Sequence, residues 1–153
     1  MYKRLELHNH TNESDAVFTC KELTDFMVAD QVDAFALTDH NTISGHCKIK
    51  NYLKEHPQPI DFIPGMEYTT YYGHILCLNL TEYVPWENIN RHKPELLFRA
   101  ARKKGALVGV AHPYSFGWPF AQGCRFEMTI TDYSCCDFIE IFNNPEPLHE
   151  VNE

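Results

Sequence analysis

Short apolar runs alternate along this chain with longer segments in which apolar residues recur every three or four positions. Short apolar runs are typical of buried strands, and the longer recurrence is typical of amphipathic helices. The pattern predicts strands over residues 3–7, 34–37, 61–63, 73–80, 106–110 and 138–142. It predicts helices over residues 21–30, from a cap at Thr42 or Ser44 to about residue 55, and over residues 94–104. Because strands and helices alternate, we expect an α/β fold with a largely parallel sheet.

Side chains that bind metals follow the ends of four predicted strands. His8 and His10 come directly after the first strand, and alternate residues of an extended chain point to the same side. The others are Asp15 in the following loop, His40 after the second strand, Glu67 and His74 around the third and fourth, and His112 after the fifth. Sites in parallel α/β folds form where strands end at their carboxyl side. Imidazole suits zinc or iron, and carboxylate suits harder ions such as manganese, so the pattern predicts a metal site.

These residues also carry a family resemblance. His8-Asn9-His10-Thr11 with Ser14-Asp15, Thr38-Asp39-His40-Asn41, Gly65-Met66-Glu67 with Gly73-His74, Ala111-His112-Pro113 and Ile139-Glu140-Ile141-Phe142-Asn143 occur in this order. The ordered set resembles the PHP family of polymerase and histidinol phosphatase type phosphoesterases. The resemblance covers nearly the whole chain, and we expect residues 1–153 to be a single PHP-like domain.

The resemblance implies a distorted (β/α)7 barrel that holds a cluster of two to three divalent metal ions, zinc, manganese or iron. In such a cluster His8, His10 and Glu67 would bind one ion, and Glu67 would bridge to a second that His74 and His112 also bind. Asp15 and His40 would bind a third. For catalysis, Asp39 is a candidate to orient a ligand imidazole or to cap the following helix, and Arg125 is a candidate to bind substrate phosphate.

One motif of the family is missing from this sequence. PHP proteins usually end with a strand followed by Asp-x-His, which supplies two further ligands, and this chain has no such motif. We therefore expect a partial barrel, truncated toward its carboxyl end, with an unpaired strand edge. A second copy, a partner chain or a further part of a longer polypeptide would cover that edge.

Charge and composition narrow the function. A net charge of −8 argues against a dedicated nucleic-acid binder, although bound cations would still attract a small phosphate ester. The sequence shows no apolar run that predicts a membrane span, and its six cysteines lack metal-binding spacing, so we expect reduced thiols in a cytoplasmic protein.

Two functions remain open at this stage. The first is a metal-dependent phosphoesterase that uses metal-activated water to hydrolyse a small phosphomonoester, a nucleotide or an oligonucleotide end. The second is a metal-binding PHP module that is catalytically inactive or incomplete, which the missing motif favours. A metallohydrolase acting on a substrate without phosphate is a more distant third.

Overall fold

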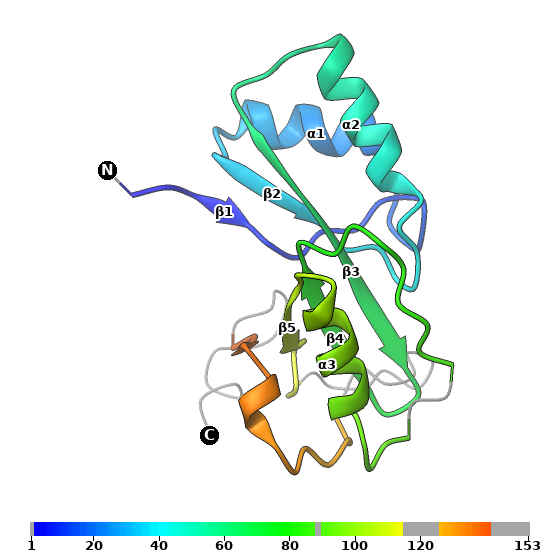
Figure 1. The fold of residues 1–153 in the computed structure, drawn as a ribbon. Helices are drawn as coiled ribbons and strands as arrows, with labels where there is room; N and C mark the ends of the chain where they lie inside the picture. Colours follow the sequence, from blue (N-terminus) through cyan, green and yellow to red (C-terminus); the bar gives the residue numbers. More distant parts are fainter. Residues whose placement is uncertain (1, 88–89, 115–125, 142–153) are drawn as a thin grey trace. The chain divides into compact units, whose positions relative to one another are not determined.

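The computed structural model describes residues 2–87, 90–114 and 126–141 of the chain (Figure 1). The chain divides into two compact units: Met1–Met66 with Leu78–Tyr83, and Glu67–Cys77 with Val84–Glu153. Strand β3 (Asp61–Thr70) runs through both units, and the strand order follows the chain from β1 to β6. Arg125 lies outside the described residues. No helix among the described residues is long and apolar enough to cross a membrane.

The first unit is built from parallel strands and two helices, as the alternating pattern predicts. It contains β1 (Leu5–Glu6), α1 (Cys20–Ala29), β2 (Ala34–Leu37), α2 (Gly45–Glu55) and the first part of β3. β2 pairs in parallel with β1 on one side and with β3 on the other. All four residues of β2 are buried, as expected for the central strand of the three.

Helix α1 begins where its sequence provides a cap. The Thr19 side chain accepts a hydrogen bond from the backbone N–H of Glu22, and the Glu22 carboxylate accepts one from the backbone N–H of Thr19. Such a capping box stabilises a helix start by about 1 kcal/mol. Leu23 and Met27, four residues apart, then bury the same face of α1 against Phe35 and the other apolar residues of the unit. The cap therefore fixes where the preceding loop must end.

His46 is a buried histidine that joins α2 to β3. Its Nε2 lies 2.7 Å from the carbonyl oxygen and 3.2 Å from the amide nitrogen of Gly65. Sequence alone placed His46 in a helix without assigning it a contact. Burial disfavours the charged imidazolium and lowers the pKa of His46 below its usual value near 6.5. In the folded protein this side chain is therefore neutral near pH 7.

We expect His46 to make the protein less stable as the pH falls. Its pKa is lower in the folded than in the unfolded chain, so below about pH 6.5 the unfolded chain binds the extra proton first. This histidine's contribution is complete above pH 6.5 and is lost as the pH falls below it. Urea unfolding of the wild type and of His46→Gln from pH 7.5 to 5 measures this loss. Equal pH dependence in both proteins would contradict the prediction.

The second unit begins with a hairpin and ends with a short strand pair. It contains the rest of β3, β4 (Gly73–Leu78), α3 (Glu95–Lys103), β5 (Leu107–Val110), a short 3-10 helix η1 (Tyr133–Cys135) and β6 (Phe138–Ile139). Only Tyr71 and Tyr72 separate the neighbouring strands β3 and β4, and a connection this short requires antiparallel pairing. β5 and β6 pair in parallel.

A buried carboxylate holds η1 and the segment before it against α3. Glu95, in the first turn of α3, accepts hydrogen bonds from the backbone N–H and the hydroxyl of Thr131, and from the N–H of Asp132. Arg99 then pairs with Asp132 at 2.5 Å, and Arg102 donates to the Ser134 carbonyl at 2.8 Å. Helix α3 therefore carries η1 along its exposed side.

One strand prediction was wrong in extent. β3 does not stop near residue 63 but continues to Thr70, so Glu67 lies inside the strand and not after its end. His74 lies in β4, within the strand predicted over residues 73–80. The other strands and helices match their predicted ranges to within a few residues, and η1 was not predicted.

Candidate metal centre

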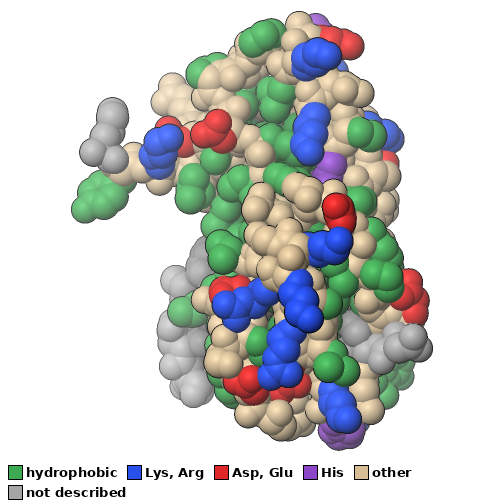
Figure 2. Space-filling model, viewed as in Figure 1, with side chains coloured by type: hydrophobic (Ala, Val, Ile, Leu, Met, Phe, Trp, Pro, Cys, Tyr) green, Lys and Arg blue, Asp and Glu red, His purple; other side chains and the backbone are tan. Residues whose placement is uncertain are grey.

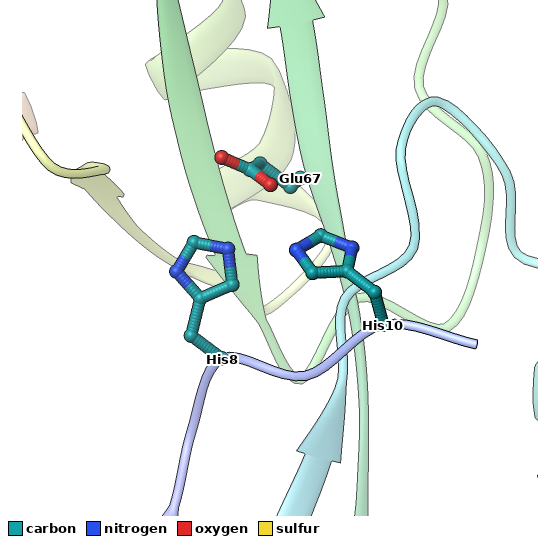
Figure 3. A group of neighbouring side chains, drawn as sticks. All are labelled: His8, His10 and Glu67. Carbon is teal, nitrogen blue, oxygen red and sulfur yellow. The ribbon is translucent and has the colours of Figure 1, made fainter. Parts of the chain in front are cut away.

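A loop between β1 and α1 carries three of the predicted ligands of the first unit. Figure 3 shows the His8 and His10 rings on the same side of the segment after β1, and their centroids are 5.0 Å apart. The backbone N–H of Asn12 donates to the Phe18 carbonyl at 2.8 Å, which closes the loop before α1 begins. Side-chain spacing in the sequence therefore predicted this pair of imidazoles correctly.

Asp39 holds this loop in place from the end of β2. Its buried carboxylate accepts hydrogen bonds from the Thr11 N–H at 2.6 Å, the Thr11 hydroxyl at 2.7 Å and the Ser14 hydroxyl at 2.7 Å. We considered Asp39 as a group that orients an imidazole or caps α2, but the hydrogen bonds seen here go to the loop. Asp39 is thus a positioning residue for the segment between His10 and Asp15.

A second carboxylate ties the same loop to α2. Glu13 accepts hydrogen bonds from the Lys48 ammonium and from the Ser44 hydroxyl, the latter at 2.6 Å. The Lys48 ammonium, followed by the Ser44 hydroxyl, holds the pKa of Glu13 below its usual value. Ser44 was predicted as a helix cap, but its side chain makes no cap hydrogen bond to α2 and serves the loop instead. Sequence reasoning missed Glu13, because no motif marks a Glu whose partners lie on a helix about 30 residues further along the chain.

The loop and the end of β2 bring together one group of three ligands. The donor atoms of His10, Asp15 and His40 all lie within 4.8 Å of one another. The His10 and His40 rings stack with centroids 4.4 Å apart, and the His40 Nε2 lies 3.4 Å from the Asp15 carboxylate. The Asp15 side chain is 67% exposed and that of His40 is 24% exposed. This group therefore opens to solvent.

The backbone conformation at position 41 explains why an asparagine follows His40. Asn41 has a φ of 53°, in the left-handed region that non-glycine residues seldom adopt. Asparagine tolerates this region better than most residues because its short side chain bonds locally. The chain therefore turns sharply after His40, and α2 begins four residues later at Gly45.

A second group of three ligands lies in the second unit, around Glu67. This carboxylate is fully buried on β3. One of its oxygens, Oε1, lies 2.8 Å from the His74 Nδ1 and 2.9 Å from the His112 Nε2. The His74 and His112 rings meet edge to face with centroids 5.0 Å apart. The side chains of Glu67, His74 and His112 are 1%, 5% and 11% exposed, so this group is closed to bulk water.

His112 is held at its position at a cost in backbone strain. Its φ is 25°, and Pro113 follows it, which further restricts its backbone. Its N–H donates to the Glu140 carboxylate at 2.8 Å. A non-glycine residue in such a region costs on the order of 1–3 kcal/mol and persists where surrounding structure imposes it. Glu140, from the segment after β6, supplies part of that constraint.

The donor chemistry of both groups suits a divalent cation. Each group combines two imidazoles with one carboxylate, which is a ligand set that zinc, iron and manganese accept. A buried carboxylate is costly unless a cation or hydrogen-bond donors compensate it, and Glu67 lies within hydrogen-bond distance of two ring nitrogens. All seven predicted metal ligands are among the described residues. His10, Asp15 and His40 come together in the first unit, and Glu67, His74 and His112 in the second.

Comparisons with known proteins place these groups in a family. The PHP domain family matches residues 6–112, which include all seven candidate ligands. The chain belongs to the PHP domain family.

Several curated proteins are similar to this chain, at 28% to 35% identity. An uncharacterized protein of Methanocaldococcus jannaschii is 28% identical over 92% of this chain and 81% of its own length. The 5′-3′ exoribonuclease Rnm of Escherichia coli is 30% identical over 69% of this chain. The 5′-3′ exoribonuclease of Haemophilus influenzae is 35% identical over 56% of it. The chain spans 40% and 32% of the lengths of these two exoribonucleases.

Two solved structures share the fold. A two-domain protein from Bacteroides vulgatus, with a predicted PHP-like metal-dependent phosphoesterase, matches 91% of this chain and 44% of its own, with a TM-score of 0.69 and 22% identity. A protein from Bifidobacterium adolescentis inferred to be a metal-dependent phosphoesterase matches 97% of this chain and 80% of its own, with a TM-score of 0.68 and 14% identity. At these identities the match establishes the fold, and it supports the expectation of a partial PHP-type barrel.

Proposed function

We propose that this protein is a metal-dependent phosphoesterase that hydrolyses a phosphate ester bond. Its substrate would be a small phosphomonoester, a nucleotide or an oligonucleotide end. The observation that carries the proposal is the buried Glu67 carboxylate, with two imidazole nitrogens within 2.9 Å of one oxygen. Membership of the PHP family and the names of the exoribonuclease relatives support the same reaction class.

The seven candidate ligands differ in burial, and we expect this to set how readily each group exchanges its ion. Glu67, His74 and His112 are closed to water and suit an ion that stays bound, whereas the group that contains Asp15 and His40 is more exposed and suits an ion that exchanges. His8, beside His10 on the same loop, completes the set that the family resemblance implies. Divalent ions, when bound, supply a nucleophile from water at neutral pH and neutralise phosphate charge.

The protein's own groups would hold the exposed ligand group in a fixed geometry before substrate arrives. Asp15 carries the more exposed of the two ligand carboxylates, so the group that it forms with His10 and His40 is open to a ligand from solvent. The His10 and His40 rings stack beside Asp15. The Asp39 carboxylate holds the loop in place by accepting hydrogen bonds from Thr11 and Ser14. A site held in one geometry before substrate arrives lowers the entropic part of the barrier.

Metal content measured against activity tests the proposal. We expect protein purified without chelator to contain two or more equivalents of zinc, manganese or iron. Mild chelation should remove the exposed ion first and leave the buried one, so metal loss should occur in two stages. Plasma mass spectrometry of the dialysed protein, with hydrolysis of p-nitrophenyl phosphate and of mononucleotides at each stage, measures both.

Activity that survives complete metal removal would contradict the proposal. Two equivalents of bound metal without hydrolysis of any phosphate ester would instead favour a PHP module that binds metal but is inactive. That alternative rests on the missing Asp-x-His motif in the sequence.

A further inference from the structure

Positive charge is concentrated in one short stretch of this acidic protein. The stretch from 91 to 104 contains six of the chain's 13 Lys and Arg residues, and Glu95 is its only acidic residue. We call these six cations the basic face: Arg91, Lys93, Arg99, Arg102, Lys103 and Lys104. All six are exposed, whereas Glu95 is buried. The net charge of −8 therefore conceals a local positive surface, and Figure 2 shows Lys and Arg side chains gathered over α3.

Part of the basic face is already paired, but its charge is not cancelled. Arg99 pairs with Asp132 at 2.5 Å, and Arg102 lies 3.4 Å from Asp137. The side chains of Arg99 and Arg102 remain 53% and 40% exposed. A guanidinium has five N–H donors, so each keeps donors that a phosphate oxygen can reach. Pairs this exposed contribute little to stability, and their side chains remain available to a ligand.

Exposed aromatic rings are interleaved with these cations at both ends. At the start of the stretch the Arg91 guanidinium lies 5.1 Å from the centre of the Tyr72 ring, and Tyr71 packs against Tyr72 with centroids 5.1 Å apart. Along α3, Tyr133 follows Asp132 in η1 and is 61% exposed, while Tyr71 is 65% exposed. Rings beside cations are the features by which proteins bind single-stranded nucleic acid, because bases stack on rings while cations follow the phosphates.

The aromatic end of this surface lies close in the chain to the Glu67 group. Tyr72 precedes His74 by two residues on the same hairpin, and His74 contacts Glu67. From there the basic face follows α3, whose nine residues span about 14 Å at 1.5 Å per residue. At the roughly 3.4 Å per phosphate of one duplex strand, that length matches about four phosphates.

We propose that the basic face, with Tyr71, Tyr72 and Tyr133, binds the backbone and bases of single-stranded nucleic acid. The binding itself does not depend on the proposed function, but the claim that the bound strand is a substrate does rest on it. The protein would then hydrolyse a phosphate ester within or at the end of an oligonucleotide. A free phosphorylated metabolite would bind more weakly than the oligonucleotide. A membrane surface has no bases to stack on the tyrosine rings, so removing a ring should weaken binding to nucleic acid and not to a membrane.

Fluorescence anisotropy with a hydrolysis-resistant strand tests the proposal. The probe is a fluorescein-labelled, 5′-phosphorylated 2′-O-methyl oligouridine of about 12 nucleotides. We expect the logarithm of affinity to fall linearly with the logarithm of salt concentration, by about 0.7 per phosphate contacted. Replacing Lys93 and Lys103 together by Gln should weaken binding about tenfold at low salt and reduce that slope by about 1.4. The matched pair Lys50→Gln and Lys54→Gln, exposed on α2, should change neither.

A ring variant provides the second, independent measurement. Tyr71→Ala should weaken binding about fivefold or more without changing the salt slope, because stacking releases no counterions. If the Lys93/Lys103 and Lys50/Lys54 double variants lose the same affinity for the oligonucleotide, the proposal is overturned. The lysine pair on the basic face could weaken binding while Tyr71→Ala has no effect, and the protein could bind phosphatidylserine vesicles as tightly as the oligonucleotide. That result would overturn the proposal in favour of a general anion surface.

Failure of this inference is distinguishable from failure of the proposed function. If the unmodified protein hydrolyses p-nitrophenyl phosphate but does not bind the oligonucleotide, the nucleic-acid surface is wrong and the phosphoesterase remains. If it binds the oligonucleotide as described but hydrolyses no phosphate ester, the surface remains and the phosphoesterase is wrong.

Discussion

Glu67→Gln should lower metal-dependent hydrolysis by at least about 100-fold at saturating metal. Loss of a group that merely supports a ligand costs about 10–100-fold, and Glu67 contacts both His74 and His112 directly. Glutamine keeps the size of the side chain but removes its charge. It also replaces one of the two carboxylate oxygens by an amide N–H₂, which cannot bind a cation. Steady-state kinetics with p-nitrophenyl phosphate, at increasing metal concentration, measures the loss.

Stability measurements separate this effect from unfolding. Because Glu67 is buried, removing its charge also removes a desolvation cost, so the metal-free variant should unfold at the same temperature as the metal-free parent or higher. Addition of metal should raise the melting temperature of the parent much more than that of the variant. Glu55→Gln, at the exposed end of α2, is the control and should behave as the parent does. Full activity in Glu67→Gln would refute the assignment of the buried ligand group.

Asp39→Ala should destabilise the protein by about 3 kcal/mol or more. The change leaves the Thr11 N–H, the Thr11 hydroxyl and the Ser14 hydroxyl without their acceptor in a buried place. Each unsatisfied buried group costs about 1–3 kcal/mol. Urea unfolding followed by circular dichroism measures the free energy of unfolding. The exposed Asp61→Ala is the matched control and should change it by less than about 0.5 kcal/mol.

The conservative variant tests whether Asp39 positions the loop. Asp39→Asn keeps one oxygen acceptor, so it should lose less stability than Asp39→Ala. Both variants should weaken metal binding at the exposed group by about 10–100-fold, the range for residues that support ligands. Calorimetric titration of the metal into each variant gives that affinity. A stable Asp39→Asn protein with unchanged affinity would show that the carboxylate is structural only.

Local sequence patterns predicted much of the fold for identifiable reasons. Strand β2 was predicted over its observed range because four apolar residues stand between polar neighbours, and all four are buried. Helix α1 was predicted to within one residue from its apolar spacing, and the capping hydrogen bonds between Thr19 and Glu22, three residues apart, came only with the structure. Strand β3 was predicted too short because Pro64 and Gly65 usually interrupt strands. Pro64 is the last residue of β3 paired with β2, so its missing N–H is tolerated there.

The ligands were predictable, but their supports were not. The candidate ligands are few, chemically distinct and placed near strand ends, so spacing and family resemblance both indicated them. Glu13 and Glu140 contact the site only through folding of distant segments, with partners 35 and 28 residues away in the chain. His46 likewise gives no local signal of its bond to Gly65. Residues that act through long-range contacts need the structure before their roles can be assigned.

The left-handed backbone at His112 has a consequence for engineering this protein. Glycine adopts that conformation without a steric penalty, so a search for heat-stable variants would tend to replace His112 first. The same replacement would remove one of the two imidazoles beside Glu67. Selection for thermal stability alone would therefore erode the buried ligand group, a trade-off that is common where function requires strained residues. Stabilising substitutions are better sought at residues that belong to neither ligand group.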